Sequence, residues 1–368
     1  MKVSVVLQSF NHAEYIAEAL DSVLMQRAGF PFEILVGDDA STDGTREIIA
    51  GYARRHPDRV FPLFPDEPMG NAGGLIFKAL LERARGEYIA LLDGDDHWLA
   101  DDKLSLQVAV LEERDCAFCF HETIVFFEDG TRGAQLFNAG QAPTTRLEDL
   151  LGAWNTIATS SVLYRNRGAG ELPGWLFEIT AIDWALNILN ARHGDIAFID
   201  RPMSVYRIHP GGVWSRLSRV EELEQKLASL AQLESSLPSR YRGQLEYARS
   251  KLRTMLVVER HVPPGRTGVL VMTGGDDQFL ALDGRHTRRL PFDGDTAQHP
   301  ASSEAAIAQV EQARIDGAEY LLIPDAQRPW LELNDEFATH LDARHTRIWT
   351  DADCTIYKLV ALSRPATP

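Results

Sequence analysis

The sequence contains few cysteines and no long uninterrupted apolar segment. Its 368 residues include three cysteines, an odd number that favours a reducing compartment over a disulfide framework. No apolar run approaches the length of a transmembrane helix. The apolar run near the start is too short for a signal peptide, and no small-residue cleavage site follows it. We therefore expect a cytoplasmic protein; peripheral attachment to the inner face of the membrane and homo-oligomerisation stay open.

Positive charge is also scarce. Lys and Arg number 37 against 53 Asp and Glu, which gives a formal net charge of −16 at pH 7. A nucleic-acid-binding protein needs a basic face, so the composition argues against this class. Phosphorylated ligands remain compatible, because a bound metal ion screens the local repulsion. A hydrophobic content of 45% is that of a globular protein, and the length favours two domains.

Strand and helix patterns alternate in the first half of the chain. Strand-like apolar runs occur at 3–7, 32–36, 59–64, 88–92, 116–127, 157–164 and 196–199. Helical spacing occurs at 12–26, 45–52, 71–84, 102–113 and 182–191. This alternation predicts an α/β fold with a mostly parallel, Rossmann-like sheet and right-handed crossovers.

A helical segment and a second α/β pattern follow. Residues 220–257 have helical character interrupted at Pro238, and the composition shifts to Pro and Gly at 261–266. Beyond it, strands are predicted at 269–272, 320–323 and 354–360, and helices at 303–315 and 332–343. We expect three parts: a main domain over 1–218, a helical arm over 219–260, and a small α/β accessory domain of unknown role over 261–368.

The segment 86–98 carries the strongest chemical signal. A strand of apolar residues ends in Asp93-Gly94-Asp95-Asp96. Carboxylate oxygens suit Mg²⁺ or Mn²⁺, which commonly accompany phosphate groups. Ligands of open α/β sheets bind beyond the carboxyl ends of the strands. The segment predicts a metal and phosphate site, and a solvated Asp-rich turn is the alternative.

The first half resembles the family 2 glycosyltransferases, which have the GT-A fold. The similarity rests on five segments in the right order, 3–11, 34–45, 86–95 (the DxD motif of the family), 182–184 and 206–215. Any one motif is weak evidence, whereas five in order are strong. The resemblance implies a metal-dependent, inverting transfer of a sugar from a nucleoside diphosphate donor. A UDP-sugar is the favoured donor, and a hydroxyl of a glycan or lipid-linked acceptor receives the sugar.

The resemblance also implies roles for the acidic residues. Asp95 is expected to touch the metal, and Asp93, next to Gly94, to orient the ribose or share the ion. Asp38 and Asp39 end the second predicted strand, where a carboxylate can accept hydrogen bonds from a base or ribose. Asp39 is favoured for the base, and ordinary turn chemistry is the alternative for both.

The same resemblance supplies a base and a second metal contact. Asp183 lies where the family places its catalytic base, which takes the proton of the acceptor hydroxyl. A helix N-cap is the alternative for this residue, and the two roles are compatible. His209 is a candidate contact for the metal or the diphosphate, with a surface or packing role equally open.

The sequence departs from the family pattern near the expected donor pocket. Gln8-Ser9 replaces the usual Pro-Thr ahead of Phe10-Asn11, and Lys78 stands where Asn is common. We assign these five residues to donor binding. Their differences from the pattern leave the sugar and the base of the donor open.

Two other functions are compatible with the same residues. A nucleotidyltransferase would use similar metal chemistry at phosphorus, but it usually has a Gly-rich basic loop that is missing near residues 8–12. A non-catalytic sensor of nucleotide-sugars would bind the donor without turnover and use the C-terminal domain as its output.

Overall fold

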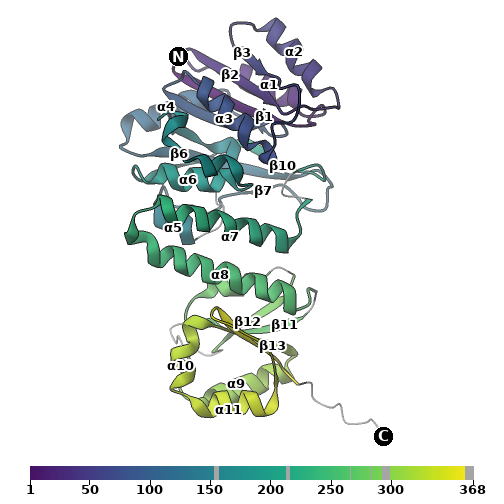
Figure 1. Cartoon of the computed structure of the whole chain (residues 1–368), viewed down its shortest axis with the longest axis vertical. Helices are drawn as coiled ribbons and strands as arrows, with labels where there is room; N and C mark the ends of the chain where they lie inside the picture. The colour runs from purple at the N-terminus through teal and green to yellow at the C-terminus, as the bar shows by residue number, and fades with distance from the viewer. Residues whose placement is uncertain (153–156, 213–215, 266, 283, 292–298, 361–368) are drawn as a thin grey trace. The chain divides into compact units, whose positions relative to one another are not determined.

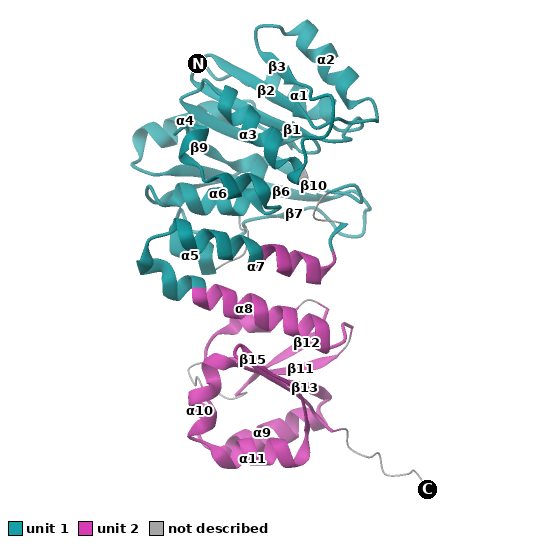
Figure 2. Cartoon of the chain, viewed as in Figure 1, with its two compact units in different colours: residues 1–217, 228–245 teal, residues 218–227, 246–368 magenta. Residues whose placement is uncertain are grey.

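The computed structural model describes residues 1–152, 157–212, 216–265, 267–282, 284–291 and 299–360 (Figure 1). The chain divides into two compact units (Figure 2). Unit 1 holds residues 1–217 and 228–245, and unit 2 holds 218–227 and 246–368. Helices α7 (Arg219–Ser236) and α8 (Arg242–His261) occupy the segment expected as a helical arm, and each is divided between the two units. No helix within the described residues combines the length and apolarity that crossing a membrane requires.

The sheet of unit 1 begins with four parallel strands in the order β3-β2-β1-β4. These are β1 (Val3–Ser9), β2 (Phe32–Asp38), β3 (Val60–Leu63) and β4 (Tyr88–Asp93). The sheet continues from β4 through β9 (Leu163–Arg165), β6 (Phe118–Phe127), β10 (Ile196–Ile208) and β5 (His97–Trp98). Strands β6 and β10 are parallel, and β9 and β5 run antiparallel to their neighbours. The short strands β7 (Gln135–Leu136) and β8 (Thr144–Thr145) pair with β6 and β10. The predicted mostly parallel α/β architecture is confirmed.

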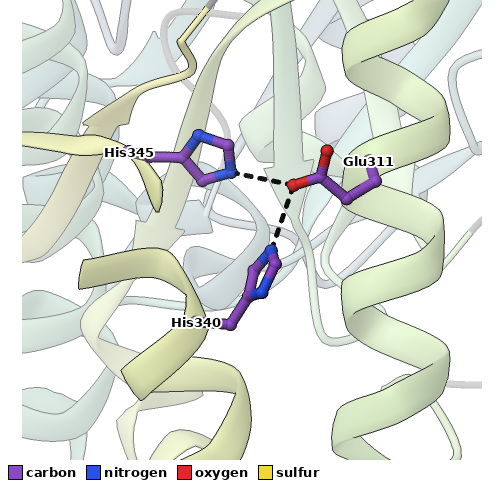
Figure 3. A group of neighbouring side chains, drawn as sticks. All are labelled: Glu311, His340 and His345. Atoms are coloured by element: carbon purple, nitrogen blue, oxygen red, sulfur yellow. Dashed lines mark hydrogen bonds and ion pairs between the residues drawn. The ribbon is translucent and has the colours of Figure 1, made fainter. Parts of the chain in front are cut away.

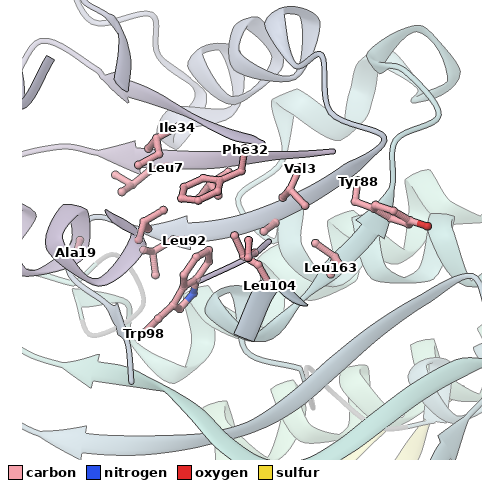
Figure 4. Close-up of a cluster of buried hydrophobic side chains, with 14 of the residues drawn as sticks. Val3, Leu7, Ala19, Phe32, Ile34, Tyr88, Leu92, Trp98, Leu104 and Leu163 are labelled. Atoms are coloured by element: carbon pink, nitrogen blue, oxygen red, sulfur yellow. The ribbon is translucent and has the colours of Figure 1, made fainter. Parts of the chain in front are cut away.

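Helices cover both faces of the parallel strands. Helices α1 (Ile16–Leu24), α2 (Thr45–Arg55) and α4 (Lys103–Glu113) share one apolar cluster with side chains of β1, β2 and β4 (Figure 4). Helix α3 (Gly74–Arg83) packs on the other face, where a Cβ on Gly37 would lie 2.8 Å from Ile76 and 2.9 Å from Leu80. Helices α5 (Leu147–Gly152) and α6 (Ile182–Ala191) contact each other. Burial on both faces explains why these strands are continuous apolar runs.

Polar groups at the amino ends of the strands satisfy one another. The buried carboxylate of Glu33 accepts hydrogen bonds from Ser4 Oγ (2.7 Å), Arg85 N (2.9 Å) and Arg85 Nε (2.9 Å). A Cβ on Gly86 would lie only 2.3 Å from Ser4 N, so this glycine allows the chain to enter β4 against β1. The polar groups at the amino ends are therefore bonded to one another within the fold. We look for the functional site at the carboxyl ends of the strands.

The segment 157–164 differs from its prediction as a strand. Residues Thr159–Ser161 form a 3₁₀ turn, and only Leu163–Arg165 is extended as β9. Ser161 Oγ donates to the carbonyl of Ala158 at 2.7 Å. Serine side chains that bond to nearby backbone favour turns over ladders, which accounts for the difference.

Unit 2 is a smaller α/β domain with the strand order β12-β11-β13-β15-β14. Strands β11 (Gly268–Met272), β12 (His286–Leu290) and β13 (Ala318–Pro324) are parallel, and β14 (Thr346–Thr350) and β15 (Cys354–Lys358) are antiparallel. Helices α9 (Ser303–Ile315), α10 (Arg328–Glu332) and α11 (Asp335–Arg344) share one apolar cluster with this sheet, and the end of α8 shares another. The second α/β pattern is confirmed. The sequence analysis missed β12 and β14 because both are edge strands rich in polar residues.

Lys103 predicts an unusual dependence of unit 1 stability on pH. Its side chain is fully buried, Nζ donates to Gln107 Oε1 at 2.7 Å, and it lies 4.1 Å from the ring centroid of Trp98. Burial lowers the pKa of Lys103 to about 7. Between this value and the ordinary pKa near 10.5, the unfolded chain binds more protons than the folded chain, so this residue's contribution to stability rises with pH.

In the wild type we expect this effect to raise the free energy of unfolding by about 1–2 kcal/mol from pH 7 to pH 9. Lys103→Met should lack this rise. Urea denaturation followed by tryptophan fluorescence measures this difference against the wild type. Lys358→Met, at an exposed position, controls for the loss of a cation. Equal pH dependence in Lys103→Met and the wild type would contradict a depressed lysine pKa.

Candidate active site

The carboxyl ends of β2, β1 and β4 meet at one edge of the sheet. The strand register places Gln8 beside both Gly37 and Asp93, and Ser9 beside Asp38. The polar residues that follow these three strands therefore lie side by side. This edge brings together the predicted donor-binding residues of the first, second and fourth strands.

The turn after β4 is tied closely to the end of β1. Gly94 N donates to the carbonyl of Gln8 at 2.7 Å. A Cβ on Gly94 would lie 2.8 Å from His12 Nδ1, 2.9 Å from Ser9 Oγ and 3.0 Å from Gln8 O. The close approach requires glycine at this position. It fixes where Asp93 and Asp95, on either side of it, present their carboxylates.

Two imidazoles converge on the carboxylate of Asp95. The Nε2 atoms of His209 and His12 lie 3.0 Å and 3.6 Å from the same oxygen, Asp95 Oδ2. The ring of His209 also packs edge-on against Tyr15, with centroids 4.8 Å apart. Burial opposes ionisation of Asp95, but the hydrogen bond from His209 and the charge of His12 together hold its pKa below the usual range. Burial also lowers the pKa of His12, against the opposing effect of Asp95. The carboxylate oxygen of Asp95 and the His209 nitrogen 3.0 Å from it are donor types that a divalent cation accepts.

The pKa values of the neighbouring aspartates are raised, whereas that of Asp95 is lowered. Burial and the charges of Asp95 and Asp183 raise the pKa of Asp93 to about 8. Burial and the charges of Asp95 and Asp93 raise the pKa of Asp96 well above its usual value. Asp96 Oδ1 accepts a hydrogen bond from Arg207 N at 2.9 Å, whereas Asp96 Oδ2 has no partner among the described residues. A cation at this cluster would relieve the repulsion that raises these pKa values.

Asp183 lies in the first turn of α6 and is half-buried. Its charge contributes to the raised pKa values of Asp93, Tyr164 and Tyr206. Its carboxylate is therefore within electrostatic reach of the acidic cluster at the end of β4. The next residue, Trp184, is buried, and its Nε1 donates to the carbonyl of Leu150 at 3.2 Å, which anchors this turn.

The two aspartates after β2 differ in their bonding. Both oxygens of Asp38 are engaged, Oδ1 with Arg46 Nε (2.7 Å) and Ser41 N (3.1 Å), and Oδ2 with the hydroxyl of Ser41. Within the described part of the chain, the Asp39 carboxylate accepts one hydrogen bond, at Oδ1 from Met69 N at 2.7 Å. Asp38 thus has a structural role in shaping the turn, and Asp39 keeps more capacity to bind a ligand.

The remaining predicted donor residues occupy different environments. Asn11 adopts a left-handed backbone (φ 55°), and its Oδ1 accepts from Thr42 N at 3.0 Å, which links the ends of β1 and β2. The Phe10 residue is 50% exposed, and Gln8 Nε2 donates to the carbonyl of Gly73. Lys78 lies on α3, near Glu82 and the ring of Phe177. Residues 213–215 of the last motif lie outside the described residues.

His12 is a site residue that the sequence analysis did not assign. It directly follows the assigned residues 8–11 in the turn after β1, which is the signal that could have identified it. The proximity of His12 to Asp95 comes from the pairing of β1 with β4 across 83 positions of the chain. Tyr206, whose pKa burial and the four aspartates raise, is a second such residue.

Unit 2 contains another group of metal-ligating residue types, Glu311, His340 and His345 (Figure 3). The Nε2 atoms of His340 and His345 lie 3.0 Å and 3.3 Å from Glu311 Oε1. Val360 N donates to His345 Nδ1 at 3.3 Å, which places the proton of the neutral ring on Nε2 and leaves no lone pair there for a metal. The other oxygen of Glu311 pairs with Arg314. We interpret this group as a polar tie between α9 and α11.

The first part of the chain is similar to a family of known proteins. Residues 4–169 match the model of the family described as glycosyl transferase family 2. An uncharacterized protein of Mycobacterium tuberculosis is 39% identical over 214 residues, which are 58% of this chain and 60% of that protein. The putative teichuronic acid biosynthesis glycosyltransferase TuaG of Bacillus subtilis is 37% identical over 143 residues, 39% of this chain and 54% of TuaG. The chain thus spans between half and two thirds of these relatives.

A solved structure shares the fold. The crystal structure of S. aureus TarS 1-349 in complex with UDP-GlcNAc aligns with a TM-score of 0.54 and 17% identity, over 98% of this chain and 100% of that chain. Asp183 and His209 lie beyond the residues that the family model matches. The sequence match and the sheet agree with the resemblance drawn from the motifs. Residues 4–169 of this chain are therefore similar to glycosyl transferase family 2, and the chain has the GT-A fold.

Proposed function

We propose that this protein is an inverting glycosyltransferase that moves a sugar from a nucleoside diphosphate donor to an acceptor hydroxyl. The observation that carries the proposal is the convergence of Asp93, Asp95 and Asp183 beyond the carboxyl ends of a family 2 sheet. Ligands of such sheets bind at this edge. Unit 2 would serve as an accessory domain.

The donor is proposed to be a UDP-sugar, in keeping with the UDP-GlcNAc bound by TarS. Asp39 would accept hydrogen bonds from the base, and residues 8–11 would line the same pocket beside Gly94. A glycan or lipid-linked acceptor agrees with the role named for TuaG in teichuronic acid biosynthesis.

Asp95 and His209 would hold a divalent cation, Mg²⁺ or Mn²⁺. Their oxygen and nitrogen atoms lie 3.0 Å apart, and a cation here would favour the charged forms of the neighbouring Asp93 and Asp96. When bound, such an ion neutralises charge on the diphosphate leaving group. Asp93 would share this cation or orient the ribose.

Asp183 would act as the general base. The acceptor oxygen attacks the anomeric carbon from the face opposite the diphosphate, and Asp183 receives the hydroxyl proton. A new C–O bond forms to the acceptor while the old one breaks, and its electron pair leaves with the nucleoside diphosphate. One displacement inverts the anomeric configuration and needs no covalent intermediate.

A panel of nucleotide-sugars with and without Mn²⁺ tests the donor class. We expect UDP-sugars to raise the melting temperature in the presence of Mn²⁺, because a ligand that binds only the native state stabilises it. Release of UDP in the presence of an acceptor would support transfer. Pyrophosphate release from a nucleoside triphosphate would instead indicate nucleotidyl transfer, and binding without turnover of any acceptor would indicate a sensor.

Replacement of the metal-binding carboxylate tests the cation site. We expect Asp95→Asn to weaken Mn²⁺-dependent binding of UDP by about tenfold or more, because a neutral amide is a poorer ligand for a hard cation. Isothermal titration of UDP at fixed Mn²⁺ measures this. Asp195→Asn, at a half-exposed aspartate just before β10, is the matched control. Unchanged Mn²⁺ dependence in Asp95→Asn would refute the assignment.

Replacement of the proposed base separates binding from chemistry. We expect Asp183→Asn to bind the donor as the wild type does and to lower the transfer rate by about 10²-fold or more, since general base catalysis contributes at this scale. Donor affinity and single-turnover rates measure the two effects. Undiminished turnover would show that another group takes the proton.

A further inference from the structure

We propose that unit 2 contains a binding site for a neutral sugar ring of a glycan, in the pocket that α10 and α11 form with β13, β14 and β15. This inference goes beyond the proposed function, because every residue that lines the pocket belongs to unit 2 and none belongs to the site beyond β4. It gives the accessory domain a role in holding a carbohydrate.

The floor of the pocket is the edge of the second sheet. The strand register places Ile323, Thr355 and Thr350 in one row across β13, β15 and β14. Arg347 and Tyr357 are paired in the next row. The register of β14 shifts after Arg347, which allows residues three apart on this strand, Arg347 and Thr350, to line the same pocket.

The helices supply apolar walls. Leu331 of α10 and Ala338 and Leu341 of α11 line the pocket, and Leu341 and Ile323 are buried. The pocket has a volume of about 350 Å³, which lies in the range of small-molecule sites. The small side chain of Ala338 leaves this space open. An apolar surface of this kind can pack against the C–H bonds of a pyranose ring.

Hydroxyl groups occur beside these apolar side chains. Thr350 Oγ1 and Thr355 Oγ1 lie 2.8 Å apart. Tyr357 Oη donates to Asp342 Oδ1 at 2.8 Å and accepts from Arg347 Nε at 3.2 Å. A hydroxyl both donates and accepts hydrogen bonds. The threonine pair can therefore exchange hydrogen bonds with the hydroxyls of a sugar, which have the same two capacities.

The charges around the pocket are balanced within the fold. Arg347 pairs with Asp342. Arg328 Nη2 lies 2.6 Å from Asp325 Oδ1 and donates to the carbonyl of Asp351 at 2.8 Å. Both arginines that line the pocket thus have a carboxylate partner, and Asp351 adds a further negative charge to the lining. An anionic ligand would be repelled by these carboxylates, so the pocket favours a neutral ligand.

The test uses NMR spectra of the full chain with labelled threonine methyl groups, which report binding at Thr350 and Thr355. The neutral probes are the methyl glycosides of glucose, mannose and N-acetylglucosamine, and the anionic probes are glucuronate and inorganic phosphate. We expect both threonine signals to shift with at least one neutral glycoside. The dissociation constant should be on the order of 1 mM, since a single ring makes few contacts.

Two variants locate the site. Ala338→Leu should fill the pocket and weaken glycoside binding by about tenfold or more, whereas Ala308→Leu, at an exposed position of α9, should leave it unchanged. Thr350→Val removes one hydroxyl at an exposed position and should weaken binding by about threefold or more, through the loss of one hydrogen bond. Thr355 remains as the reporter in that variant.

No shift at Thr350 and Thr355 with any neutral glycoside would overturn the inference, and so would shifts with phosphate or glucuronate alone. Equal glycoside affinity in Ala338→Leu and the wild type would also overturn it. Binding of UDP is measured on the same samples. Glycoside binding without UDP binding would count against the proposed function alone, and UDP binding without glycoside binding would count against this site alone.

Discussion

The register of β1 with its two parallel neighbours is the constraint on which the site depends. Pairing of Gln8 with both Gly37 and Asp93 sets the ends of three strands level. The shared apolar cluster on one face of the sheet holds this register, because a slip by one residue would move every side chain to the opposite, differently packed face. The turns after these strands then have to lie together. Chemistry at this edge is a consequence of how the strands are packed.

The two ends of the same sheet manage buried charge in different ways. At the amino end, Glu33 is matched by Arg85 and Ser4, so the charge is neutralised within the fold. At the carboxyl end, Asp93 and Asp96 have raised pKa values and Asp95 is matched only by histidines. Perturbed carboxylates of this kind cluster at functional sites. A cation at the carboxyl end would stabilise the charged forms of these carboxyls and could also bind a diphosphate.

Unit 2 shows how similar residue types lead to a different result. Glu311 with His340 and His345 resembles a metal-ligand set in composition. His340 is hydrogen-bonded to this carboxylate, the Nε2 side of the His345 ring faces it at 3.3 Å, and Arg314 pairs with its other oxygen. In unit 1, Asp95 Oδ2 likewise meets the ring of His209, but among the described residues no arginine forms an ion pair with its carboxylate. We interpret the Glu311 group as structural because an arginine already neutralises its carboxylate, and the Asp95 group as a candidate cation site because its carboxylate meets only histidines among the described residues.

The sequence alone determined the α/β class, the four parallel strands that begin the first sheet and the carboxylates at the end of β4, because apolar period and turn residues are local properties. Its predicted strand at 157–164 is correct only at its end, because Thr159–Ser161 form a turn in which Ser161 bonds to nearby backbone and β9 begins at Leu163. Only the tertiary structure decided that His209 and His12 reach the same oxygen of Asp95, from positions 114 and 83 residues away. It also decided that Asp38 is occupied by Arg46 while Asp39 is less engaged. These contacts between residues far apart in the sequence depend on the strand order and on how the crossover helices pack. No local sequence pattern predicts them.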